Sequence, residues 1–267
     1  DLSHVAYYAA YFISSWNASA DRVELGPDVS ASDPRRVSIA VDSPWPNLTY
    51  IGIYAKSSLV EQTTPAFIVV NDNAAAVSAV NLTDLDLDGG ELGGAISWQV
   101  PSDTSQVTYY AVHLALDDTG ANRSVVDAAV ATSIESVHLA VESPLADFKY
   151  VVVYTASSLV EQTTPSSALI DDVDATVDIS FIDQDLDGAE IGGAVRWQLR
   201  EYVDGVSSYR VHLVSSAEQS SQVMSEVDFG TNEVLLPADT VLGSGNFMAV
   251  YSKSVLAEQT TPGNATI

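Results

Sequence analysis

A segment that ends in Glu-Gln-Thr-Thr-Pro recurs three times in this chain, which restricts the fold to an array of similar units. The three copies occupy residues 54–65, 154–165 and 251–262, about 100 residues apart. A second, acidic segment, Asp-x-Asp-Leu-Asp-Gly-x-Glu, occurs only at 84–91 and 183–190. A repeat length near 100 residues is typical of one small β-sandwich domain.

The unequal number of the two segments sets the predicted domain boundaries. Residues 73–171 (repeat two) and 172–267 (repeat three) each contain both segments. Residues 1–72 (repeat one) contain only the second half of a repeat and lack the part that carries the acidic segment. We therefore predict two whole repeats that follow an incomplete one.

Each whole repeat carries several short stretches in which apolar and polar residues alternate. In repeat two these lie at 96–100, 110–114, 137–141 and 150–154. A period of two, interrupted by Gly, Pro, Asp and Ser, is typical of half-buried strands, and no apolar stripe with the helical period is visible. About seven such strands in about 100 residues predict an all-β sandwich.

The order of strands and aromatic residues resembles a known kind of sandwich. A strand that ends in Trp98, then Pro101, then a strand with Tyr110 and Val112, resembles the second and third strands of fibronectin type III and immunoglobulin-like domains. The resemblance implies tandem Ig-like, fibronectin-type-III-like β-sandwiches, the first one incomplete. Trp98 and its counterpart Trp197 are then expected in the cores.

The two repeated segments are also similar to tandem repeats in uncharacterised secreted proteins of single-celled algae. This second resemblance implies an extracellular or cell-surface repeat protein, and it assigns no activity to any residue.

Because Glu61, Glu161 and Glu258 recur in every copy, we interpret them as structural residues that shape a turn.

The composition disfavours several classes of function. The chain has 36 acidic and 10 basic residues, a net charge of −26, which disfavours binding to nucleic acid or to an anionic membrane surface. No segment approaches the ~20 apolar residues of a membrane-spanning helix. The chain has no cysteine, and no nucleophile motif or histidine–carboxylate pair is recognisable. We expect neither an enzyme nor a membrane-inserted protein.

The incomplete repeat indicates self-assembly. Without its first two strands, repeat one keeps one sheet with a single strand facing it, so its apolar face needs another cover. Residues 5–13 are all apolar or aromatic, unlike the matching strands of repeats two and three. We predict the structural subunit of an extracellular filament, a head-to-tail homopolymer that assembles through repeat one, with strand complementation as one physical mode. The predicted interface residues are Val5, Tyr7, Tyr8, Tyr11, Phe12, Ile13, Trp16 and Trp45.

Two other interpretations stay open. In one, the chain is a window of a longer repeat array, and the missing strands belong to an attached segment. In the other, the chain is an adhesion or carbohydrate-binding module of a long cell-surface protein, with surface glycans as its partners. An exposed aromatic patch in repeat three would favour the second of these.

The acidic segments carry the candidate calcium ligands, because calcium prefers six to eight oxygen atoms. Each segment begins like an EF-hand loop, but its twelfth position is Ala95 or Ala194 instead of the bidentate glutamate. The alternative is a solvated acidic edge that prevents unwanted strand pairing. The candidate ligands are Asp84, Asp86, Asp88, Glu91, Asp183, Asp185, Asp187 and Glu190.

Five of the nine asparagines lie in Asn-x-Ser/Thr sequons, where about two would be expected by chance. The excess indicates N-linked glycans, added in a secretory pathway, and the alternative is coincidence in a chain rich in serine and threonine. The five candidate sites are Asn17, Asn47, Asn81, Asn122 and Asn264.

Overall fold

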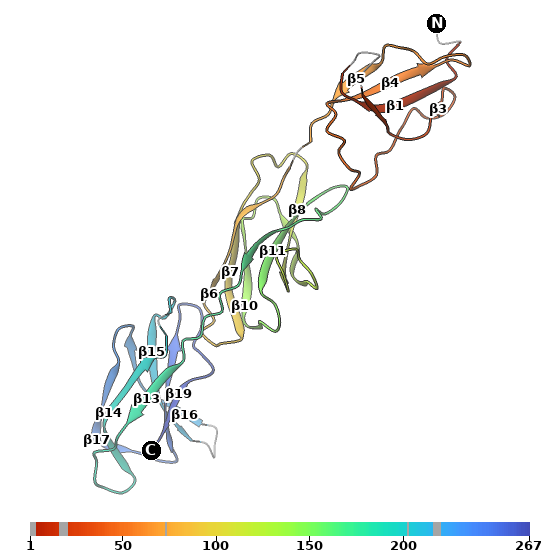
Figure 1. Ribbon diagram of the computed structural model, residues 1–267. Helices are drawn as coiled ribbons and strands as arrows, with labels where there is room; N and C mark the ends of the chain where they lie inside the picture. The colour runs from red at the N-terminus through yellow and green to blue at the C-terminus, as the bar shows by residue number, and fades with distance from the viewer. Residues whose placement is uncertain (1–3, 16–20, 73, 202, 216–219) are drawn as a thin grey trace. The chain divides into compact units, whose positions relative to one another are not determined.

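The computed structural model describes all of the chain except residues 1–3, 16–20, 73, 202 and 216–219 (Figure 1). The described residues form β-strands and no α-helix. Among them, no helix has the length and apolar character needed to cross a bilayer. The chain divides into two compact units, Asp1–Ala74 and Ala75–Ile267.

Repeat two is a sandwich of two antiparallel sheets in the second unit. The first, second and fifth strands form one sheet in the order β10-β7-β6, and the other four form the facing sheet in the order β12-β11-β8-β9. The strands are β6 (Ser78–Asp84), β7 (Glu91–Gln99), β8 (Val107–Ala115), β9 (Ser124–Ala131), β10 (Ser136–Pro144), β11 (Tyr150–Ser157) and β12 (Ser166–Leu169).

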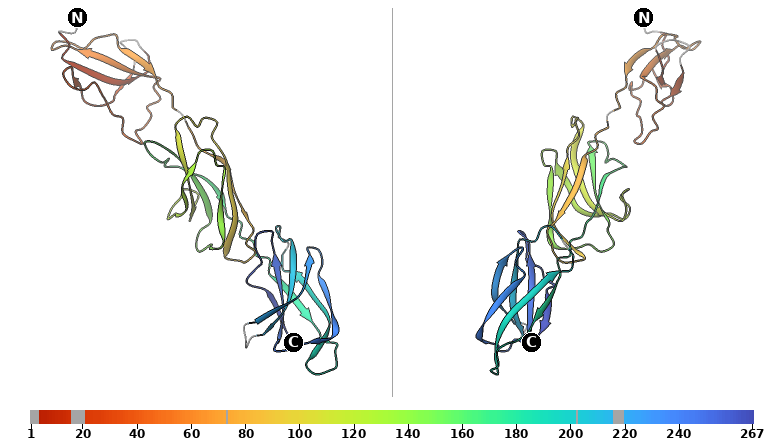
Figure 2. Two further views of the ribbon diagram at one scale, coloured as in Figure 1. Left: turned by 180° about the vertical axis from the view of Figure 1, so that it is seen from behind. Right: turned by 60° about the vertical axis from the view of Figure 1, so that its left-hand side comes forward.

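Repeat three has the same strand order. Its sheets are β13-β14-β17 and β16-β15-β18-β19, and both views of Figure 2 show them facing each other. The strands are β13 (Val177–Phe181), β14 (Glu190–Leu199), β15 (Ser208–Ser215), β16 (Ser220–Asp228), β17 (Glu233–Val241), β18 (Phe247–Lys253) and β19 (Gly263–Thr266). The prediction of tandem fibronectin-type-III-like sandwiches is confirmed.

An aromatic pair fills the space between the sheets of each sandwich. Trp98 on β7 meets Tyr110 on β8 edge to face at 5.7 Å, and Trp197 meets Tyr209 in the same way at 5.5 Å. All four side chains are buried. Both tryptophans therefore lie in the cores, as the sequence predicts. Each large ring there shields apolar surface of both sheets from water.

The first unit contains a single sheet in the described residues, with the order β2-β1-β4-β5 and β3 paired with β1. No strand of the described part of this unit faces it: residues 36–44, which match β10 of repeat two, have no strand assignment. The expectation of one facing strand is wrong, because β10 takes its ladder hydrogen bonds from β7 and the first unit has no counterpart of β7. The strands are β1 (Tyr7–Ile13), β2 (Arg22–Glu24), β3 (Val29–Ser30), β4 (Tyr50–Lys56) and β5 (Ala66–Val69).

A glycine at the same position of each sandwich fixes the backbone near the start of its second strand. Gly94 has a φ of +144°, and a Cβ on it would lie 2.1 Å from the carbonyl oxygen of Thr83 on the neighbouring strand. Gly193 has a φ of +135°, with its Cβ position 2.8 Å from the carbonyl oxygen of Ile182. Only glycine fits, because the backbone conformation is left-handed and the next strand leaves no room for a side chain.

Replacing Gly94 by alanine should destabilise repeat two by about 2–3 kcal/mol, because both the backbone strain and the clash with Thr83 must be relieved. Urea unfolding followed by tryptophan fluorescence measures the loss. The matched control is Gly188→Ala, since a Cβ at Gly188 meets no atom within 4 Å. Equal effects of the two substitutions would contradict this account of the glycine pair.

Candidate functional site

The acidic segment of repeat two forms a short loop between β6 and β7, which we call acidic loop two (residues 84–91). Its first carboxylate holds the loop in shape: Asp84 Oδ1 accepts hydrogen bonds from the N–H groups of Asp86 and Gly93 at 3.2 and 2.9 Å. Asp86 repeats the pattern, with Asp88 N–H donating to Oδ1 at 3.3 Å and Glu142 N–H to Oδ2 at 2.5 Å. The alternating aspartates therefore accept hydrogen bonds from backbone donors of the loop and of the strands beside it.

The third carboxylate, that of Asp88, binds repeat three. Thr260 donates to its Oδ2 through N–H at 2.6 Å and through its hydroxyl at 3.2 Å, and Thr261 N–H donates to its Oδ1 at 2.8 Å. These threonines belong to the Glu-Gln-Thr-Thr-Pro segment of repeat three, a turn between β18 and β19 that we call threonine loop three (residues 254–262). The two recurrent segments of the sequence thus contact each other across the boundary between two repeats.

Leu87, at the tip of acidic loop two, is inserted between the repeats. Only 1% of its surface is exposed, and its carbonyl oxygen accepts Ala175 N–H at 3.0 Å and Gln259 Nε2–H at 2.9 Å. The Ser254 hydroxyl donates to the carbonyl oxygen of Leu85 at 2.8 Å. Burial of Leu87 and these charge-assisted and neutral hydrogen bonds join repeats two and three through one loop.

Acidic loop three (residues 183–190) has the same internal hydrogen bonds but no partner repeat among the described residues. Asp183 Oδ1 accepts Asp185 N–H at 3.0 Å and Gly192 N–H at 2.9 Å, and Asp185 Oδ2 accepts Asp239 N–H at 2.7 Å. The N–H groups of Asp239 and Asp187, which both donate to Asp185, lower the pKa of its carboxyl. Leu186, the counterpart of Leu87, is 98% exposed.

Each loop also gathers four carboxylates that could hold a cation. In repeat two, one oxygen of each group lies within 4.8 Å of the others, and Asp239 joins the corresponding cluster in repeat three. Sequence reasoning missed Glu142 and Asp239, although both are acidic residues at matching places in the fifth strand of their repeat, β10 and β17. Asp84 and Asp183, which the sequence also suggests as ligands, are outside the clusters. The two clusters are Asp86, Asp88, Glu91 and Glu142, and Asp185, Asp187, Glu190 and Asp239.

Crowding of negative charge shows in the titration of Glu142. Loss of water around the carboxyl raises its pKa, and a hydrogen bond to Glu91 and the charges of Glu91, Asp86 and Asp88 raise it further. A site with this charge favours a bound proton or a divalent cation, both of which offset the repulsion.

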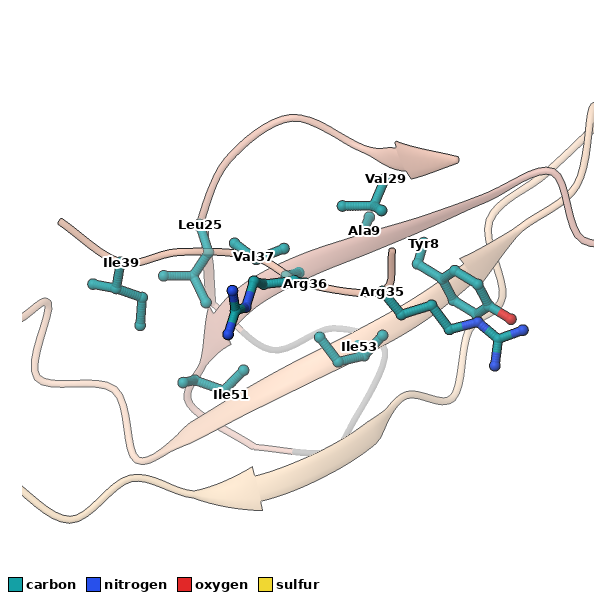
Figure 3. A pocket seen from close by; sticks show the side chains of 11 residues that line it. Tyr8, Ala9, Leu25, Val29, Arg35, Arg36, Val37, Ile39, Ile51 and Ile53 are labelled. Carbon is teal, nitrogen blue, oxygen red and sulfur yellow. The ribbon is translucent and has the colours of Figure 1, made fainter. Parts of the chain in front are cut away.

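The second candidate site is the face of the first unit's sheet that no second sheet of described residues covers, which we call the open face. Ile53 on β4 is 37% exposed, whereas its counterpart Val153 in repeat two is 1% exposed, under the facing sheet. A groove of about 370 Å³ lies on this face, and Figure 3 shows the side chains of Tyr8, Leu25, Ile51 and Ile53 over β1 and β4. The groove lining is Tyr8, Ala9, Ala10, Leu25, Val29, Arg35, Arg36, Val37, Ile39, Ile51 and Ile53.

The predicted assembly residues lie on both sides of this sheet. Phe12 is buried on the open-face side, where Trp45 packs against it at 5.8 Å and stays 39% exposed. On the other side Ile13 is buried, and Tyr11 donates its hydroxyl to Glu61 at 3.1 Å. Val5 and Tyr8 are half-buried, Tyr7 is exposed, and Trp16 lies outside the described residues.

The glutamate of each Glu-Gln-Thr-Thr-Pro segment forms an ion pair with an arginine. Glu61 pairs with Arg22 at 2.6 Å, and Glu161 with Arg123 at 2.7 Å. Glu258 pairs with Arg210 at 2.8 Å in repeat three. Each glutamate also bridges back to the strand that precedes its loop, so its role in these contacts is to shape the turn.

Four of the candidate glycosylation sites are described, and all four asparagines are exposed: Asn47, Asn81, Asn122 and Asn264. Asn81 donates to the hydroxyl of Thr83, the third residue of its own sequon, at 3.2 Å. Asn17 lies outside the described residues. The positions are accessible to a glycosylating enzyme, and they remain predictions.

Two solved structures that were found as similar are arrays of fibronectin type III domains. The FN1–FN3 domains of chicken CNTN1 are 18% identical, with 99% of this chain and 89% of that chain covered and a TM-score of 0.29. The central fibronectin-III array of RIM-binding protein is 12% identical, with 98% of this chain and 87% of that chain covered and a TM-score of 0.25. No family model and no curated protein matches the chain. The class follows from the strand order: a tandem array of fibronectin-type-III-like sandwiches.

The two acidic loops provide a matched test of the contact between repeats. Asp88→Ala should lower the free energy of unfolding of the second unit by about 2–4 kcal/mol, because three donors of repeat three lose a charged acceptor. Asp187→Ala should change it by less than about 0.5 kcal/mol in dilute solution, since no described residue donates a hydrogen bond to Asp187. Urea unfolding measures both, and equal losses would contradict the assignment.

Proposed function

We propose that the protein is the structural subunit of an extracellular filament, a homopolymer in which copies assemble head to tail through the first unit. The observation that carries the proposal is the open face. Ile53 and the groove around it expose an apolar surface that the facing sheet covers in repeats two and three. An exposed apolar patch of this kind marks an interaction surface.

The pattern of strands indicates what covers the open face. Residues 36–44 keep the alternating apolar residues of a strand but lack the neighbour that β7 provides in repeat two. A strand pair from another copy would supply the missing ladder hydrogen bonds and the missing core side chains together. Strand complementation is therefore the mode that we propose for this contact.

The charge and the sequons support an extracellular location. A net charge of −26 keeps free subunits apart, so their assembly should strengthen with ionic strength or with divalent cations. The four described sequon asparagines all lie on the surface, where glycans leave the sandwich cores undisturbed. The absence of cysteine from the sequence means that disulfides contribute nothing to such a filament.

Ile53→Asp should abolish filament formation and leave the second unit folded, because it places a charge in the apolar contact at a position that is already partly exposed. Negative-stain electron microscopy and sedimentation velocity of the untagged protein measure assembly. The control is Tyr7→Asp, on the opposite side of the same sheet, which should still assemble. Filaments formed by the Ile53 variant, or monomers of the unaltered protein under all salt conditions, would contradict the proposal.

We also propose that the carboxylate clusters bind calcium. The cluster of repeat two lies at the junction with repeat three and combines four carboxylates, the type of oxygen ligand that calcium prefers. A cation there would offset the repulsion that raises the pKa of Glu142. Calcium would then stiffen the junction between repeats, because Asp88 would bind both the cation and the backbone of threonine loop three.

Calcium should raise the Tm of the second unit at pH 7, and Glu142→Gln should raise the Tm of the calcium-free protein while weakening its response to calcium. Because the pKa of Glu142 is raised on folding, its contribution to stability is present in acid and is lost as the pH rises through the folded pKa. The gain from Glu142→Gln should therefore be larger at pH 7 than at about pH 4. Differential scanning calorimetry measures this, with Asp118→Asn as control, and an unchanged Tm with calcium would contradict the proposal.

A further inference from the structure

We infer that acidic loop three docks onto the threonine loop of the first unit (threonine loop one, residues 57–65) of a second copy of this chain. The contact is separate from the open face. It rests on the proposed self-assembly and names a second surface for it. The occupant is specified by the junction between repeats two and three, where an equivalent pair of loops is already in contact.

The donating side of this junction is built mainly from the threonine loop. Thr260 and Thr261 supply the donors to Asp88, Gln259 binds the carbonyl oxygen of Leu87, and Ser254 binds that of Leu85. Outside that loop, Ala175 N–H donates to Leu87 O, Val173 N–H donates to Asp84 Oδ2 at 3.1 Å, and Asp172 Oδ2 accepts Gly90 N–H at 2.9 Å. A threonine loop is therefore sufficient to provide most of the polar contacts.

Acidic loop three is already in the conformation that binds. Its aspartates make the same internal hydrogen bonds as those of acidic loop two, and Asp239 takes the place of Glu142 as a backbone donor. What differs is the covering: Leu186 is 98% exposed, against 1% for Leu87. A leucine held out in water by a preformed loop pays little ordering entropy on docking, and its burial favours association.

Threonine loop one offers the matching surface. The Ser57 hydroxyl donates to Val60 O and accepts from Leu59 and Val60 N–H, the same turn that Ser254 makes in repeat three. Gln62 is exposed, whereas its counterpart Gln259 is 2% exposed under acidic loop two. The side chain of Gln62 and the neighbouring threonines of threonine loop one are thus exposed to solvent within the first unit.

Charge selects this loop over that of repeat two. A lysine precedes the loop both in repeat three (Lys253) and in the first unit (Lys56), but the same position in repeat two is Ala156. Residues 1–72 carry 4 basic and 8 acidic residues, whereas residues 73–171 carry 2 and 13. An acidic loop is repelled less by the first unit, which makes it the favoured partner.

The test uses the full chain with Ile53→Asp, so that contacts through the open face do not contribute. A contact of one loop with another buries little surface and should be weak, so sedimentation equilibrium is run up to about 1 mM. Leu186→Asp and Thr63→Glu should each weaken association about tenfold or more, by loss of apolar burial and by charge repulsion. Their matched controls, Ile182→Asp and Thr163→Glu, change exposed residues outside the contact and should have no effect.

Mixing the two inactive variants distinguishes a head-to-tail contact from other modes. The Leu186→Asp chain keeps threonine loop one, and the Thr63→Glu chain keeps acidic loop three. The mixture should therefore form one-to-one dimers that grow no further, although neither variant associates alone. Circular dichroism of each variant verifies that the fold is retained.

Three results would overturn the inference: association that survives Leu186→Asp, a larger loss with Thr163→Glu than with Thr63→Glu, or monomers at every concentration on the Ile53→Asp background. The filament proposal fails separately, if Ile53→Asp leaves filaments of the otherwise unaltered chain intact at micromolar concentrations, far below those at which the weak loop contact associates. The two outcomes come from different variants and are therefore distinguishable.

Discussion

The apolar face of a β-sheet must be covered, and this requirement governs both the complete and the incomplete parts of the protein. In the second unit each sheet covers the other, and the pairs Trp98–Tyr110 and Trp197–Tyr209 fill the space between them. In the first unit the described residues supply one sheet only, and Ile53 remains exposed. The same alternating pattern thus produces a buried core in one unit and an interaction surface in the other.

A second constraint is that backbone donors in tight loops need acceptors. The alternating aspartates of the acidic loops accept hydrogen bonds from the backbone N–H groups two residues further on. In this way they hold a leucine at the tip of each loop. Asp88 does the same across the boundary between repeats two and three, because its carboxylate oxygens accept hydrogen bonds from the backbone of threonine loop three. The carboxylates are consequently elements of structure first, and their clustering with Glu142 concentrates negative charge at the same junction.

Much of the fold could be predicted from the sequence, because period-two patterns and the spacing of the repeats are local signals. The strands were within reach of the sequence for that reason, and the core tryptophans followed from the resemblance to fibronectin type III domains. The sequence does not reveal that residues 36–44 form no strand, because their apolar alternation matches that of β10. They form none because the first unit lacks the pairing partner that β7 provides in repeat two. The site was partly predictable: Asp86, Asp88 and Glu91 were found by their spacing, whereas Glu142 comes from a strand more than 50 residues away.

The sequence alone determined that the chain is a repeat array, that its repeats are β-sandwiches, and that one of them is incomplete. Only the tertiary structure decided what the two recurrent segments do. They lie far apart along the chain, and they meet because the loop after β6 of one repeat faces the loop before β19 of the next. Identical leucines therefore differ completely in exposure, 1% for Leu87 and 98% for Leu186, because burial depends on the neighbour that each one meets and not on its own sequence.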